Sequence, residues 1–245
     1  MRPDKVLDLM SGARERYETV RADLRYRGDG TTIKSLREQH EQALRLSGSR
    51  RRSSGQIKHS EPDGAFGWRC RIWQVGAYRW RRELDLPGGG TEITGCYGTN
   101  FSGFPKMWHL RASTLPSGDD PEWLIYAQDY YWTFYFVDDD ISGLPRVLDG
   151  LDLRVEGETE WAGRRAVRLL GMPPAGEWDR QDDPDPLAWG ADEYELLVDR
   201  ERGIVLRCAN KLKGAEFDVL EMEEVYFDEH FAEEVLLPPQ PLSYW

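Results

Sequence analysis

The sequence contains few cysteines and no long apolar segment. Its 245 residues include three cysteines, Cys70, Cys96 and Cys208, which are widely separated and form no CxxC unit. A dispersed, odd-numbered set does not define a disulfide framework, so we expect free thiols in a reducing cytoplasm. The apolar runs fall well short of the roughly 18 residues that span a bilayer, and the start MRPDKVLDLM lacks the apolar region of a secretory signal. These absences predict a cytoplasmic protein that is not an integral membrane protein.

The short motifs of common catalytic and metal sites are also missing. No GxSxG, GxxxxGK[ST], GxGxxG or HExxH pattern occurs, and the histidines are dispersed. The acidic segment 216–234, with His230 inside it, indicates an exposed edge strand guarded by charge rather than a metal site. We therefore assign no catalytic residue, no metal and no cofactor.

The chain has fewer positively charged residues than negatively charged ones. The chain has 32 Lys and Arg against 44 Asp and Glu, a net charge of −12, so nucleic acid is not an expected partner. Ten tryptophans and an aromatic content of 12% argue against disorder. A chain of this length buries enough surface to fold without a disulfide or a metal.

The apolar spacing changes along the chain. Recurrence at three and four residues predicts helices over 4–22 and 32–47, and again over about 121–131. We expect one domain, 1–245, made of the following parts: an N-terminal helical segment (4–47), a flexible basic loop (47–60), a β meander (65–97 and 150–228) and a helical and loop excursion (98–147), in which 98–118 is irregular.

Alternation over 66–84, interrupted at Gly76, predicts a hairpin or one long bulged strand with two different faces. One face is apolar and aromatic: Phe66, Trp68, Cys70, Ile72, Tyr78, Trp80 and Leu84. The other is basic: Arg69, Arg71, Arg79, Arg81 and Arg82. These arginines form the solvated side of the sheet or pair with the acidic C-terminal strands, and a site for phosphate or an acidic partner is the remaining possibility. The fold class is α+β, with one continuous, strongly curved antiparallel sheet (a half-barrel) whose 150–228 strands follow in sequential order.

Three soft patterns resemble the outer-membrane lipoprotein-sorting (LolA/LolB-like) superfamily, which includes the N-terminal domain of the sigma-factor regulator RseB. The residues that carry the resemblance are Trp73, Gly76, Tyr78, Arg79, Trp80 and Glu83 in the first hairpin, Gly163 and Arg164 in a later turn, and Val198, Asp199, Gly203 and Arg207 in the closing strands. The resemblance covers about half of the chain. It implies an open half-barrel whose concave face is covered by helices and holds an acyl chain or another apolar ligand.

The candidate ligand-binding residues are aromatic and small apolar side chains expected on that concave face. They are Phe66, Trp68, Cys70, Ile72, Tyr78, Trp80, Trp123, Tyr126, Tyr130, Phe134, Leu206 and Cys208. The same residues also fit a filled aromatic core. Our first hypothesis is therefore non-enzymatic binding of a lipid or acyl group. The alternative is a protein–protein interaction module of the RseB type, and an unrecognised enzyme ranks third.

Overall fold

A computed structural model describes residues 1–46, 63–76, 79–85, 90–99, 105–112, 148, 150–174 and 190–237. Its elements, in chain order, are α1 (Pro3–Ser11), the 3-10 turn η1 (Ala13–Arg16), β1 (Thr19–Asp29), α2 (Gly30–Leu46), β2 (Ala65–Val75), β3 (Arg79–Asp85), β4 (Thr91–Thr99), β5 (Pro105–Ala112), β6 (Asp152–Trp161), β7 (Arg164–Met172), β8 (Glu193–Asp199), β9 (Val205–Leu212), β10 (Ala215–Phe227) and the 3-10 turn η3 (Glu233–Leu236).

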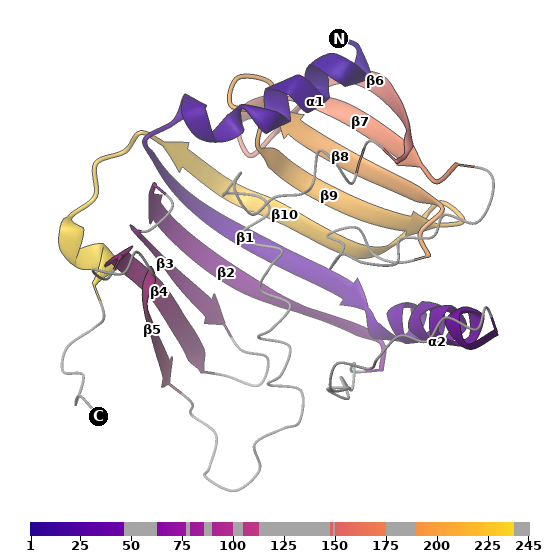
Figure 1. Ribbon diagram of the computed structural model, residues 1–245, viewed down its shortest axis with the longest axis horizontal. Helices are drawn as coiled ribbons and strands as arrows, with labels where there is room; N and C mark the ends of the chain where they lie inside the picture. The colour runs from indigo at the N-terminus through magenta and orange to yellow at the C-terminus, as the bar shows by residue number, and fades with distance from the viewer. Residues whose placement is uncertain are drawn as a thin grey trace, which may run out of the picture.

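All the strands of the described part join one antiparallel sheet. Its order is β5-β4-β3-β2-β1-β10-β9-β8-β7-β6, so β1 stands between two meanders and pairs with β2 on one side and β10 on the other (Figure 1). The strands β6 to β10 lie in sequential order, as the sequence predicts. The open, curved antiparallel sheet and the α+β class are thereby confirmed.

Each central strand has two chemically different sides. On β1, Val20, Ala22 and Leu24 are at most 1% exposed, and the charged residues between them, Arg21 and Asp23, point to the opposite side. We call the side of Val20, which α1 covers, the inner face, and the opposite side the outer face. The alternation of apolar and charged residues fixes which side is buried, because successive strand residues point to opposite faces.

Helix α1 seals part of the inner face. Pro3 occupies its first turn, where the missing N–H is not needed, and the Gly12 N–H donates to the Asp8 carbonyl at its end. Val6 (0% exposed) and Met10 (4%) face a continuous core that includes residues of β7, β8 and β9. Figure 1 shows α1 lying across the β6–β10 side of the sheet, while α2 extends from the far end of β1.

Three predicted segments are wrong. The acidic segment 216–234, expected to be an exposed edge strand, contains β10, which lies inside the sheet between β1 and β9. The helix expected over 4–22 ends at Ser11, and the rest of that segment contains η1 and the start of β1, a strand inside the predicted helical segment 4–47. The spacing of Ala13, Tyr17 and Val20 fits a helix, but an unbroken alternation of buried and more exposed residues begins at Val20. The backbone of this strand pairs with β2 on one side and with β10 on the other. The second expected helix is confirmed as α2.

The expected irregular segment 98–118 also contains a strand. β5 pairs antiparallel with β4 and forms one edge of the sheet, which is the position where a proline at the first strand residue is tolerated. One arginine was assigned to the wrong face: Arg82 is opposite Ile72 and is 5% exposed, so it lies on the inner face. The predicted hairpin over 66–84 is confirmed as β2 and β3.

Candidate functional site

An aromatic cluster lies on the inner face where β1 and β2 pair. The rings of Tyr26 and Trp68 stack with centroids 5.1 Å apart, and the centroid of the Phe66 ring lies 5.5 Å from that of Tyr26. Gly28 makes room for them, because a Cβ there would come within 2.8 Å of the Phe66 ring and the Tyr26 hydroxyl. All three rings are only half-buried, unlike the residues under α1. We call this group the aromatic cluster.

Polar groups adjoin the aromatic cluster. The Tyr26 hydroxyl donates to Asp218 Oδ2 at 3.1 Å, and Asn210 Nδ2 donates to Asp218 Oδ1 at 3.0 Å. Asp218 and Asn210 are 7% and 1% exposed. Among the described residues, nothing donates to Asn210 Oδ1. A buried acceptor without a donor is unfavourable, so this position suits a ligand hydroxyl or amine.

The predicted site residues divide into three groups. Phe66 and Trp68 belong to the aromatic cluster. The next group is buried at 7% exposure or less: Cys70, Ile72, Trp80, Leu206 and Cys208. The last group lies outside the described residues: Tyr78, Trp123, Tyr126, Tyr130 and Phe134. The sequence prediction missed Tyr26, and the signal that could have found it is the alternation of β1.

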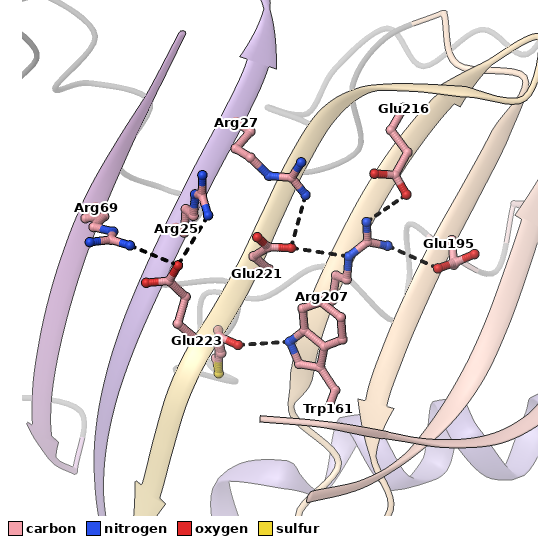
Figure 2. A network of polar contacts seen from close by, with 10 residues as sticks. Arg25, Arg27, Arg69, Trp161, Glu195, Arg207, Glu216, Glu221 and Glu223 are labelled. Carbon is pink, nitrogen blue, oxygen red and sulfur yellow. Dashed lines mark hydrogen bonds and ion pairs between the residues drawn. The ribbon is translucent and has the colours of Figure 1, made fainter. Parts of the chain in front are cut away.

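A ladder of ion pairs crosses the outer face (Figure 2). Arg25 and Arg69 share one oxygen of Glu223, at 3.5 and 3.2 Å. Between the same two strands, β1 and β10, Arg27 pairs with Glu221 at 3.3 Å. Arg25, Arg27 and Arg69 therefore pair with acidic residues of β10, which confirms for Arg69 the predicted pairing with the acidic C-terminal strands. Exposed pairs of this kind contribute about 0–1 kcal/mol each.

Arg207 is the buried centre of the ladder. Its guanidinium contacts Glu195 (3.1 Å), Glu216 (2.7 Å) and Glu221 (3.4 Å), and its side chain is 8% exposed. Burial alone would raise the pKa of Glu195, but the Lys211 hydrogen bond and the nearby positive charges outweigh it and hold that pKa below its usual 4.5. The arrangement is saturated with partners, so we interpret it as structural.

Trp161 closes this network. Its ring lies 5.4 Å from the Arg207 guanidinium, and its Nε1 donates to the Met222 carbonyl at 2.9 Å. The paired register of β10 with β9 ends at Glu221, so Met222 lies just beyond it. The indole therefore joins the β6–β7 hairpin to β10, as Figure 2 shows.

The remaining pattern residues hold the strand connections. Arg164 forms an ion pair with Asp199, whose side chain is 0% exposed. Asp199 Oδ1 also accepts the N–H groups of Glu201 and Arg202, and this fixes the turn into β9. Gly203 completes the turn at φ +80 beneath the Leu9 carbonyl of α1. These residues define the shape of the sheet, and their roles are structural rather than chemical.

The described residues contain no metal site, no membrane-spanning helix and no disulfide. No group of three metal-ligating side chains occurs among them. Within the same ranges, no helix has the length and apolarity to cross a membrane. The three cysteines are free and buried. The features left for a function are the inner aromatic cluster and the charged outer face.

The open, curled antiparallel sheet with an N-terminal helix on its inner face agrees with the open half-barrel that the sequence resemblance implies. No family model and no curated protein sequence matches the chain. Among solved structures, MucB aligns with a TM-score of 0.52 and 16% identity over 97% of this chain and 62% of that chain. The chain therefore spans less than two-thirds of MucB.

Two further structures align at lower scores. The Pseudomonas aeruginosa MucA/MucB complex gives a TM-score of 0.46 with 15% identity, over 96% of this chain and 60% of that chain. Lipoprotein LppX of Mycobacterium tuberculosis gives 0.40 with 10% identity, over 90% and 94%. At these identities the likeness concerns the fold alone.

Proposed function

We propose that this protein binds an apolar ligand, such as an acyl chain, on the inner face of its sheet, without catalysing a reaction. The LolA-like fold supports a binding role, and the residues described carry no catalytic arrangement that argues for another. Each methylene that leaves water on binding contributes about 0.8 kcal/mol. Burial of a chain of about ten methylenes is therefore enough to offset the entropy that ligand and protein lose on binding.

The observation that carries this proposal is the uneven burial of the inner face. Under α1 the face is sealed, and Leu196 and Leu206 are 0% exposed. Farther along the same face, the stacked rings of Tyr26, Phe66 and Trp68 remain half-buried. Aromatic side chains that stay partly accessible beside a buried polar group are typical of ligand sites.

The test is titration with a fluorescent fatty acid, such as parinaric acid, monitored by energy transfer from tryptophan. Trp68→Leu removes the ring that stacks on Tyr26, and we expect it to weaken binding about tenfold, which corresponds to about 1.4 kcal/mol. Trp73→Leu is the matched control, because Trp73 is also half-buried and lies on the outer face of the same strand. Equal losses in both variants, or no binding by the unmodified protein, would contradict the proposal.

A protein partner is the second candidate, because the outer face already accepts one peptide segment. In η3, Glu233 pairs with Arg79 at 3.0 Å, and the Val235 carbonyl accepts from Arg81 at 3.1 Å. Leu236 in the same turn is 1% exposed. If the fatty acid does not bind, a partner on this side of β2–β4 becomes the better explanation, and crosslinking from Arg79→Cys in cell extract would identify it.

A further inference from the structure

A hollow of about 710 Å³ lies where β1 ends and β2 begins. Its floor is strand backbone, since it is lined by all the residues of 25–29 and 65–69. From β10 it takes Glu216, Phe217 and Val219, whereas Asp218, which contacts Tyr26 on the inner face, does not line it. Tyr26, Phe66 and Trp68 of the aromatic cluster are also part of the lining. The charged residues of the lining all belong to the outer side of their strands, so we take the hollow to open on the outer face.

Three guanidinium groups border this hollow. Arg25 is directly opposite Arg69 in the strand register, and Arg27 is the next outward residue of β1. Their side chains are 45%, 63% and 45% exposed. Like charges directly opposite each other destabilise a sheet, and the one oxygen of Glu223 that both share offsets this only in part. Each guanidinium carries five N–H donors, and among the described residues each of the three has one carboxylate partner, so donors remain for a ligand.

The hollow is not filled by the side chains that line it. Gly67 is opposite Arg27, and a Cβ there would come 2.4 Å from the Tyr26 carbonyl, so no side chain fills the floor. A volume of this size is within the roughly 300–1,000 Å³ of small-molecule sites and is much larger than a bare phosphate ion. The space suits an organic molecule that carries an anionic group.

Three carboxylates belong to the same lining. Asp29 accepts from the Thr31 N–H and the Thr32 hydroxyl at the start of α2, and Glu216 is held by Arg207 at 2.7 Å. Asp85 is opposite Arg69 at the end of β3. The lining is thus formally balanced in charge, so recognition depends on direct guanidinium donors rather than on long-range attraction.

We propose that this hollow binds the phosphate group of an organic phosphate through Arg25, Arg27 and Arg69. Planar guanidinium groups recognise phosphate by paired N–H donors, and arginine is the residue best suited to this geometry. The site is on the face opposite the aromatic cluster and does not depend on the proposed function. The same chemistry is present in a soluble phosphate ester and in a phospholipid headgroup.

The experiment has two arms that separate these sources. Glycerol 3-phosphate is titrated by calorimetry, and phosphatidylglycerol vesicles are tested by co-sedimentation, with phosphatidylcholine vesicles as the reference. The variant is Arg25→Gln/Arg69→Gln, which we expect to weaken binding at least about tenfold in the arm that shows it. The control is Arg154→Gln/Arg165→Gln on β6 and β7, whose side chains are 62% and 61% exposed and also pair with glutamates.

The stability of the variant provides a second readout. Because Arg25 and Arg69 repel each other across the register, their removal should leave the melting temperature unchanged or raise it. Binding of glycerol 3-phosphate supports a soluble ligand, and binding only to phosphatidylglycerol vesicles supports a headgroup. The proposal is overturned if neither probe binds, or if the control variant loses as much affinity as the Arg25 and Arg69 variant.

Discussion

Single residues contribute very different amounts to the stability of this protein. We expect a large contribution from Arg207, whose buried guanidinium contacts three glutamates. Removal of its guanidinium leaves Glu195 and Glu221, which are 13% and 9% exposed, with one cation each, Lys211 and Arg27 respectively. Breaking a buried pair in this way costs about 3 kcal/mol or more. We therefore expect Arg207→Ala to lower the free energy of unfolding by about 3 kcal/mol in urea denaturation.

The control for Arg207 is an arginine of the same sheet with ordinary exposure. Arg165 pairs with Glu158 at 3.0 Å but is 61% exposed. Arg165→Ala should change the free energy of unfolding by less than about 1 kcal/mol. Similar losses in both variants would mean that burial of the Arg207 network does not determine its contribution.

The cysteines provide a second prediction at the residue scale. Burial raises the pKa of Cys70 to about 12, and burial also raises the pKa of Cys208. Cys96 is 1% exposed. A thiol reagent that attacks the thiolate should react very slowly with the folded protein, and should titrate all three thiols once the chain is denatured without reductant. Fewer than three would reveal a disulfide.

At the scale of elements, the packing of α1 depends on one glycine. Gly203 has φ +80, and a Cβ at this position would be 2.1 Å from the Leu9 carbonyl oxygen. Gly203→Ala must displace either the turn or α1, so we expect a loss of about 3 kcal/mol or more in chemical denaturation. Gly214→Ala is the matched control, because its φ is +79 and nothing lies within 4 Å of the added Cβ.

The control separates two physical effects. Gly214→Ala introduces only backbone strain, which costs about 1 kcal/mol. The difference between the two variants measures the contact between the turn and α1. If both variants lose the same amount, the helix adapts to the added methyl group and the close approach has no structural importance.

The strands that the sequence predicted are those whose alternation is long and bounded by clear turns. β2 and β3 were found in this way, as were the strands that follow residue 150. β1 was missed because its alternation starts inside a segment that also fits helical spacing, and because its register depends on partners far along the chain. With β1, Tyr26 was missed as well, although it is the ring that joins Phe66 to Trp68.

The sequence predicts which face of β2 holds the candidate site, but not which residues on that face are buried. Alternation places Phe66, Trp68, Cys70 and Ile72 on one side of β2, and the structure agrees. Which of them are buried depends on where the other elements of the fold pack, and spacing along a single strand carries no such information. Cys70 and Ile72 therefore belong to the core, whereas Phe66 and Trp68 stay half-buried.

At the scale of the whole molecule, the pairing of β1 with β10 makes the sheet continuous. Val20 is opposite Phe227, and the Thr19 hydroxyl donates to the Glu229 carbonyl, 210 residues away. The strands β2 to β5 and β6 to β10 each form a meander by local pairing, but they become one sheet only through β1. Long-range pairing of this kind makes folding slow and couples the two halves.

The last prediction tests that coupling at Leu24, which is 1% exposed on the inner face of β1. Leu24→Ala should lower the free energy of unfolding by about 3 kcal/mol, because it leaves a cavity between the two meanders. Leu153→Ala on the edge strand β6, where the side chain is half-buried, should cost about 1 kcal/mol. If β1 makes the chain one domain, far-ultraviolet circular dichroism and tryptophan fluorescence will give coincident unfolding curves with an unchanged denaturant slope in both variants. Two separated transitions in Leu24→Ala would instead show that the meanders on either side of β1 are independent folding units.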